Sequence, residues 1–145
     1  MDPLQILLVK DACRDLVLRA AASVDANEPG RLAALFAEGG VLVRPGGEPL
    51  AGREAIRQSY AQRPAERITR HLVVNIRVEV ESETEARAES TVLVWSGSTG
   101  DTPGPHGRPA QARQVVGEFS DRLTLTSEGW RIARREARFV LHSGA

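Results

Sequence analysis

The chain has 145 residues, of which 41% are hydrophobic and 26% charged, as is typical of one globular domain spanning residues 1–145. Its 19 basic and 19 acidic residues give a formal net charge of +0, which excludes the basic excess of a nucleic-acid-binding protein. The apolar runs are too short for a signal peptide or a membrane span, so we expect no membrane partner.

A long amphipathic helix opens the predicted fold. Asp2 followed by Pro3 is typical of an N-cap and a first helical position. Apolar residues recur every fourth position from Leu4 to Val24, which predicts one helix ending near residues 25–26. Cys13, the single cysteine, lies on this helix and is interpreted as a buried structural thiol. A lone cysteine cannot form an internal disulfide and favours a cytoplasmic location.

A second helix is predicted directly after the first. Asn27 is its expected N-cap, Pro29 lies in its first turn, and Leu35 and Phe36 belong to its apolar side. The pair Gly39-Gly40 is expected to end it.

Turn residues, together with a change in the spacing of the apolar residues, predict the remaining elements. Residues 41–50 predict a hairpin, and residues 52–64 predict a third helix that Pro64 ends. Apolar residues then alternate with polar ones, which predicts four long strands at residues 68–81, 85–96, 112–126 and 130–142. The Gly- and Pro-rich segment 96–111 is expected to be a long loop. Helices followed by antiparallel strands indicate the α+β class. We expect a cone-shaped, strongly curved and mostly antiparallel sheet that encloses the long helix and the two shorter ones.

His71 is the ambiguous residue of the first long strand. Every second residue from Leu72 to Val80 is apolar, so strict alternation places His71 on the polar face with Arg77 and Glu79. A β-bulge between His71 and Ile76 would instead turn the imidazole toward a cavity, and such bulges occur beside active sites. Both arrangements remain open.

Three stretches resemble a known family over nearly the whole chain. They are VDANEPGRLAALF at 24–36, HLVVN at 71–75 and DRLTLTSEGWRIARRE at 121–136. They are similar to the SnoaL-like branch of the nuclear transport factor 2-like superfamily, nearest to the hexachlorocyclohexane dehydrochlorinase, bile-acid dehydratase and scytalone dehydratase group. The resemblance implies a homodimer that forms through the outer face of the sheet. It also implies a catalytic dyad of Asp25 and His71.

That dyad suits general base catalysis. A free imidazole has a pKa near ~6.5 and can take a proton from carbon at neutral pH. A carboxylate on the other ring nitrogen selects the tautomer and stabilises the imidazolium. Relatives carry a second histidine where this chain has Trp95 and Ser96, and a lysine or tyrosine where it has Ala20. The resemblance therefore supplies a base, but the acid partner is not identifiable.

Six further side chains are candidates for substrate contacts. The aromatic ones would form the wall of a pocket, and an arginine could bind a carboxylate or a leaving group. They are Phe36, Arg44, Tyr60, Trp95, Phe119 and Arg122. Arg138 is a weaker candidate of the same kind. His106 and His142 have no metal-ligand spacing, so we expect no metal and no other cofactor.

We therefore expect a cofactor-independent lyase or isomerase that acts on a small, largely apolar molecule. Two alternatives remain open because fold does not determine function. One is a non-catalytic small-molecule binding protein with the same pocket. The other is an interaction or assembly module, which a collapsed cavity below the ~300 Å³ usual for ligand sites would favour.

Overall fold

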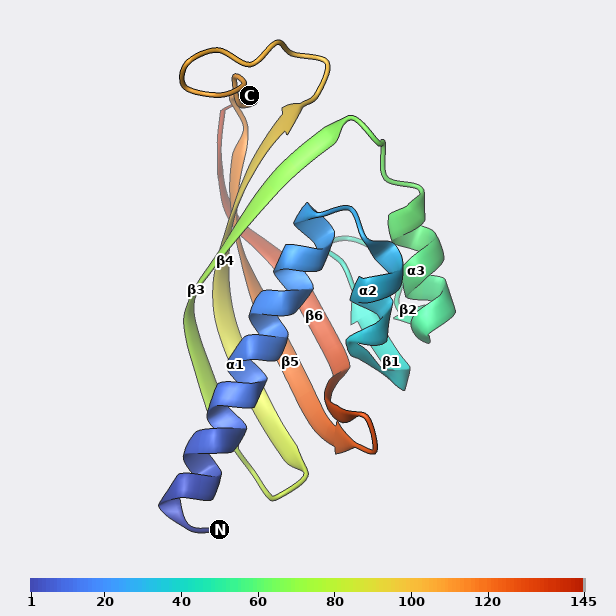
Figure 1. Cartoon of the computed structure of the whole chain (residues 1–145), viewed down its shortest axis with the longest axis vertical. Helices are drawn as coiled ribbons and strands as arrows, with labels where there is room; N and C mark the ends of the chain where they lie inside the picture. Colours follow the sequence, from blue (N-terminus) through green and yellow to red (C-terminus); the bar gives the residue numbers. More distant parts are fainter. Residues whose placement is uncertain (145) are drawn as a thin grey trace.

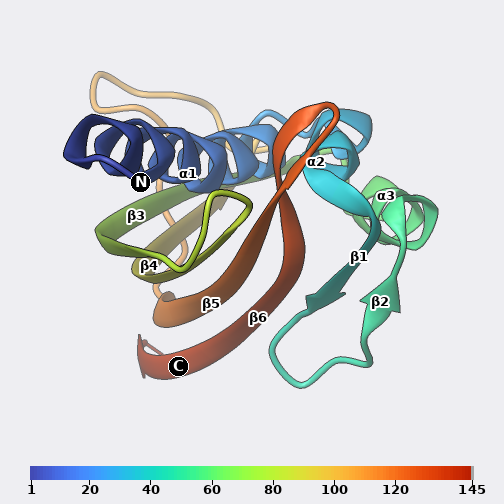
Figure 2. The ribbon, with the colours of Figure 1, turned by 90° about the horizontal axis from the view of Figure 1, so that it is seen from below.

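A strongly bent sheet wraps around one long helix (Figures 1 and 2). The computed structural model describes residues 1–144, so the last residue of the predicted domain lies outside the described part. The helices are α1 (Pro3–Asp25), α2 (Pro29–Ala34) and α3 (Arg53–Ala61). The strands are β1 (Phe36–Val43), β2 (Leu50–Ala51), β3 (Arg67–Val80), β4 (Glu85–Ser98), β5 (Gln114–Thr126) and β6 (Gly129–Ser143).

The sheet has the strand order β2-β1-β6-β5-β4-β3 and is mixed but mostly antiparallel. Only the pair β1 and β6 is parallel. Helix α1 lies across the concave face and contacts β3 most extensively, while α2 and α3 pack together beside β1 (Figure 1). This arrangement confirms the predicted α+β cone.

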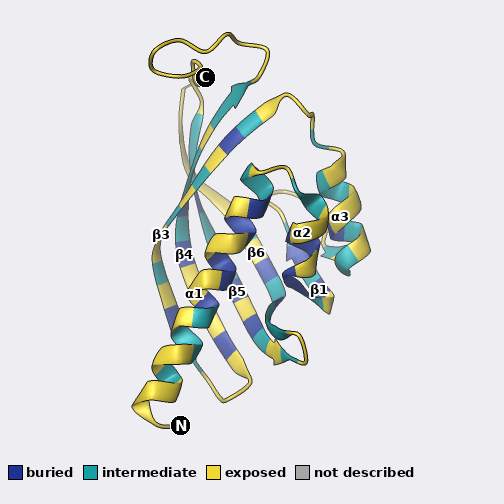
Figure 3. Cartoon of the chain, in the orientation of Figure 1, coloured by how far each residue is buried: buried dark blue, intermediate teal, exposed yellow. Residues whose placement is uncertain are grey.

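Helix α1 has the predicted boundaries. The Asp2 side chain accepts a hydrogen bond from the Gln5 backbone N–H at 2.8 Å, and the Gln5 side chain accepts one from the Asp2 N–H at 2.9 Å. This reciprocal capping box satisfies two of the free donors at the start of the helix. Cys13 and Val17 are fully buried, whereas the first two turns are mostly exposed (Figure 3). Burial raises the pKa of the Cys13 thiol to about 11, as expected for a structural cysteine.

The prediction for the second helix was wrong at both ends. Glu28 and not Asn27 is the N-cap of α2, and the helix stops at Ala34. Phe36 instead opens β1, where it pairs with Ile132 of β6. A Cβ on Gly40 would lie 2.8 Å from the Ile132 carbonyl oxygen. Gly40 therefore permits a close approach of two strands, a long-range contact that no local pattern reveals.

Strand β3 contains the bulge that would turn His71 inward. Its pairing with β4 is regular as far as Val74 and shifts before Arg77. Asn75 between them has a φ of 53°, a left-handed conformation that asparagine tolerates better than most residues. The bulge prediction is confirmed. Strict alternation is wrong for the first half of the strand, because Leu72 and Val74 are 48% and 40% exposed.

The long loop lies beyond the ends of β4 and β5 (Figure 1). Strand β4 extends to Ser98, so the loop covers residues 99–113, later than the predicted 96–111. The Thr99 N–H donates to the Glu66 carbonyl at 2.9 Å, and the Gln111 N–H donates to the Ser96 carbonyl at 2.8 Å. These contacts attach both ends of the loop to the sheet. Within residues 1–144, no helix is long and apolar enough to cross a membrane.

Candidate functional site

A cavity of about 670 Å³ lies between the concave face of the sheet, the end of α1 and helix α3. It is lined by side chains from β1, β3, β4, β5 and β6 as well as from all three helices. The volume lies within the range usual for small-molecule sites. It therefore does not favour the alternative of an assembly module with a collapsed pocket.

Asp25 and His71 meet at this cavity. Asp25 is the last residue of α1, which packs on β3. Its Oδ1 lies 2.6 Å from Nδ1 of His71, and its Oδ2 accepts the His71 backbone N–H at 2.8 Å. The side chains are 15% and 19% exposed, and His71 lines the cavity. One carboxylate thus holds both the ring and the backbone of the histidine.

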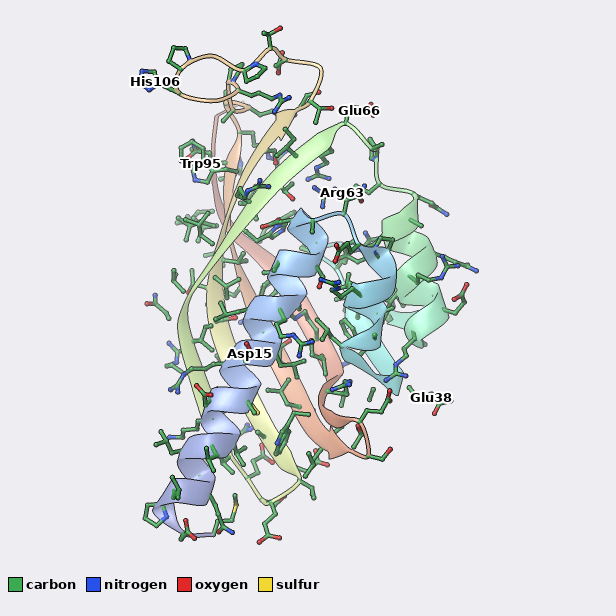
Figure 4. The ribbon with its side chains drawn as sticks, in the orientation of Figure 1. Asp15, Glu38, Arg63, Glu66, Trp95 and His106 are labelled. Carbon is green, nitrogen blue, oxygen red and sulfur yellow. The ribbon has the colours of Figure 1, made fainter. Side chains whose placement is uncertain are left out.

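Two residues that the sequence did not single out support this pair. Thr69 is buried and donates from Oγ1 to Asp25 Oδ1 at 2.9 Å. Arg63 donates to Thr69 Oγ1 at 2.6 Å and to the Val24 carbonyl at 2.9 Å. Figure 4 shows Arg63 beside the C-terminal end of α1. Arg63 thereby connects the end of the helix to β3.

The local sequence indicates the position of Thr69 in part, but it does not indicate the role of Arg63. Thr69 stands two positions before His71, so it shares the inner face of β3 once the bulge is known. Arg63 follows α3 in an irregular segment. No periodicity marks it, and only the tertiary structure reveals its role.

The hydrogen bonds at Asp25 act on the pKa of its carboxyl group. Burial alone would raise the pKa of Asp25. The ring and backbone hydrogen bonds from His71, its charge, and the Thr69 hydrogen bond outweigh burial and lower the pKa below its ordinary 3.8. Asp25 is therefore an anion at neutral pH and can only accept hydrogen bonds. Nδ1 of His71 must carry the proton, which leaves the Nε2 lone pair available as a base.

The other predicted substrate contacts divide into two groups. Phe36, Arg44, Tyr60 and Phe119 line the same cavity as His71. Trp95 and Arg122 do not line it.

Strand register explains why neither residue lines the cavity. Trp95 pairs with Arg70, whereas its neighbour Ser96 pairs with the buried Thr69. Trp95 therefore faces outward and is 44% exposed, on the side of the sheet away from α1 (Figure 4). Arg122 is exposed and adjoins the buried Asp121, so it also belongs to the outer face.

A buried ion pair forms one side of the cavity. Arg135 donates to both carboxylate oxygens of Asp121, at 2.7 and 2.9 Å. Its guanidinium carbon lies 4.1 Å from the centroid of the Phe119 ring. Arg138, the weaker sequence candidate, also lines the cavity but bonds Glu118 at 3.2 Å. These two arginines are therefore neutralised by acidic partners.

Hydroxyl groups are among the other polar functions that line the cavity. Tyr60 and Ser96 line the cavity, and so does Ala20, which offers no hydrogen-bond donor from its side chain. Within residues 1–144, no group of three histidine, cysteine or carboxylate side chains is arranged to hold a metal ion. The arrangement offers one imidazole base, the carboxylate that orients it, hydroxyl groups and several arginine side chains.

A bent sheet around a long helix, with a cavity between them, defines the class of cone-fold proteins. The chain belongs to the SnoaL-like domain family, whose model matches residues 5–136. No curated protein matches it in sequence.

Solved structures show the same fold. A candidate scytalone dehydratase from Novosphingobium aromaticivorans has a TM-score of 0.81 at 25% identity, covering 97% of this chain and 90% of that one. Hexachlorocyclohexane dehydrochlorinase LinA-type3 from Novosphingobium barchaimii has a TM-score of 0.81 at 17% identity, covering 98% and 93%. A structure of LinA has a TM-score of 0.83 at 20% identity, covering 100% and 95%.

Proposed function

We propose that the chain is a cofactor-independent lyase or isomerase that moves a proton to or from carbon on a small molecule. The observation that carries the proposal is the 2.6 Å contact between His71 Nδ1 and Asp25 Oδ1 at the wall of the cavity. His71 is the general base and Asp25 the residue that orients it. The dehydratase and dehydrochlorinase among the similar structures support this class of reaction.

In the proposed reaction, Nε2 of His71 removes a proton from a carbon next to an electron-withdrawing group. The C–H electron pair forms the new double bond, and the leaving group departs from the neighbouring carbon with its own electron pair. The Asp25 carboxylate stabilises the imidazolium that results. A halide leaves as the anion, whereas a hydroxyl must gain a proton to leave as water. The Tyr60 and Ser96 hydroxyls at the cavity are the candidates to assist it.

The test is His71→Gln in a screen of β-hydroxy ketones and halogenated alkanes. Glutamine keeps a polar side chain but supplies no base, so turnover should fall by roughly 10²- to 10⁴-fold. The Kd of a non-reactive ketone should change little. His106→Gln is the matched control, because His106 lies in the exposed loop (Figure 4) and does not line the cavity. Turnover that survives His71→Gln would contradict the proposal.

One specific observation supports the alternative of a non-catalytic small-molecule binding protein. Ala20 lines the cavity at the position where dehydratase relatives carry a lysine or tyrosine. If the purified chain binds small molecules tightly but turns over no compound of the screen, this alternative replaces the lyase.

We also propose that the protein forms a homodimer through the outer face of the sheet. Leu72 opposes Leu93, Leu93 opposes Val116, and Val116 opposes Leu141. These four residues, the outer apolar row, cross four strands on the face away from the helices. A formal net charge of +0 produces little repulsion between two copies.

A cytoplasmic location remains a prediction from the lone cysteine.

A further inference from the structure

The cavity is strongly basic, which the neutral net charge of the chain does not suggest. Six arginines line it: Arg44, Arg63, Arg67, Arg113, Arg135 and Arg138. None of the described residues that line it is an aspartate or a glutamate. Its positive charge can be balanced only by acidic groups behind the lining or by a ligand.

Acidic groups behind the lining balance only part of this charge. Arg135 is paired with Asp121 and Arg138 with Glu118. Arg44, Arg67 and Arg113 form no ion pair with any other residue from 1 to 144. Three guanidinium groups at one cavity are therefore without a described counter-charge.

Arg63 lies partly buried beside the charge of Arg67. Its pKa is lowered, first by burial and next by the charge of Arg67. The negative charge of Asp25 acts in the opposite direction but does not cancel these effects. An anion entering the cavity would relieve the repulsion between Arg63 and Arg67.

Of the three arginines without an ion pair, Arg44 is the one whose guanidinium contacts described side chains. It follows β1 directly and donates a hydrogen bond to Ser59 Oγ of α3. Its guanidinium carbon lies 5.0 Å from the centroid of the Tyr60 ring. Within the described part of the chain, no acceptor other than Ser59 bonds its side chain. The planar fork is thus held against α3 while its remaining donors stay available, and such a fork matches the two oxygens of a carboxylate.

Arg44 and His71 stand on different walls of the cavity. Strand β1 precedes Arg44 and strand β3 carries His71, and β6, β5 and β4 lie between them in the bent sheet. The intervening strands present apolar residues to the cavity, among them Val92, Val94 and Phe119. A molecule reaching from one wall to the other would lie along these apolar side chains, with the Arg44 guanidinium at one end and the His71 imidazole at the other.

We infer that the ligand of this cavity is a small carboxylic acid with an apolar body, whose carboxylate is bound by Arg44 while its reacting carbon faces His71. The inference rests on the proposed function, which it deepens by naming the substrate class of the same site. It replaces the expectation of a largely apolar molecule by that of an amphipathic acid. Arg67 and Arg113 add long-range attraction for the anion.

The test compares carboxylic acids with their neutral primary amides by titration calorimetry on the full chain. The probes are benzoate, cinnamate, 4-acetylbenzoate, cyclohexanecarboxylate and 1-naphthoate, each with the amide of the same shape. At least one acid should bind about tenfold or more tightly than its amide, since a charge-assisted pair replaces a neutral one.

Variants of Arg44 test whether this residue causes the preference for acids over amides. Arg44→Gln should reduce the preference to less than about threefold, and Arg44→Lys should keep part of it, because an ammonium retains the charge without the fork. Arg122→Gln is the matched control and should keep the full preference, since Arg122 is an exposed arginine outside the cavity. A panel in which no acid is preferred overturns the inference. So does a preference that survives Arg44→Gln.

Binding and turnover separate this inference from the proposed function. The calorimetry is repeated on His71→Gln, which should bind the acids without converting any substrate. A preference for acids in a protein with no turnover supports the inference and contradicts the lyase. Turnover of neutral ketones with no preference for acids supports the lyase and overturns the inference.

Discussion

Three donors converge on the Asp25 carboxylate: the Nδ1–H of His71, its backbone N–H and the Thr69 hydroxyl. They compensate the desolvation of a charge at the end of a packed helix. Because the ring and the backbone of His71 bind the same carboxylate, the imidazole has little freedom to rotate. At the scale of single residues, orientation of the base and stability of the fold depend on the same three hydrogen bonds.

This dependence predicts a pH-sensitive contribution of Asp25 to stability. The pKa of Asp25 is lower in the folded chain than its ordinary 3.8. Its stabilisation is therefore complete above about pH 4 and is lost as pH falls through the folded pKa. We expect Asp25→Asn to lower the free energy of unfolding by about 1–3 kcal/mol near neutral pH. The difference from the wild type should shrink on acidification below pH 3.8, as measured by urea unfolding.

Asp15→Asn is the control for this experiment. Asp15 lies on the same helix and forms only an exposed pair with Arg19 at 3.9 Å. An exposed pair of this kind contributes less than ~1 kcal/mol. A difference between wild type and Asp25→Asn that grows as the pH falls would show that the Asp25 pKa is raised and not lowered.

At the scale of elements, the bulge in β3 decides which residues face the cavity. Before Asn75 the inner positions are Thr69, His71 and Val73, and after it they are Ile76 and Val78. One additional residue exchanges the two faces of a strand, because side chains alternate with a period of two. Asn75 thereby lets a single strand contribute both to the site and to the apolar core.

The conformation of Asn75 predicts how substitutions behave there. Its φ of 53° suits glycine and disfavours β-branched residues. Asn75→Gly should leave the free energy of unfolding nearly unchanged, and Asn75→Val should lower it by about 1–2 kcal/mol. Arg77→Val, at an exposed position of the same strand, controls for the β-propensity of valine. Equal stability of Asn75→Val and Asn75→Gly in urea unfolding would show that the bulge is absent in solution.

At the scale of the whole molecule, the two faces of the sheet have separate roles. The concave face carries the cavity, and the opposite face carries the outer apolar row of Leu72, Leu93, Val116 and Leu141. Trp95 adds a large exposed ring to the same outer face. Contiguous apolar surface of this kind marks interaction sites in soluble proteins.

The outer apolar row predicts the assembly state. We expect the purified chain to have twice its monomer mass in size-exclusion chromatography with light scattering. Leu93→Glu should raise the dimer Kd by at least about 30-fold, because it places a charge in the centre of the interface. Leu125→Glu is the control, since Leu125 is an exposed leucine of β5 outside the row. A wild-type chain that remains monomeric would contradict the homodimer.

The sequence by itself determined most elements of the fold, because periodicity and turn residues are local. The capping signal at Asp2, the period of α1 and the alternation in β4 to β6 depend only on neighbours along the chain. The second helix was the exception. Gly40 belongs to a strand whose partner, β6, lies about ninety residues further along the chain.

The candidate site was predictable in its two central residues and in part of its wall. Asp25 and His71 were identified through the family resemblance of the segments that carry them, and the structure places them in contact. Only the tertiary structure decided that His71 faces inward and that Trp95 faces outward. It also decided that Thr69 donates to the Asp25 carboxylate while Arg63 donates to Thr69. The physical reason is that a strand's faces are assigned by its register with its neighbours. One bulged residue reverses that assignment without a mark in the hydrophobic pattern.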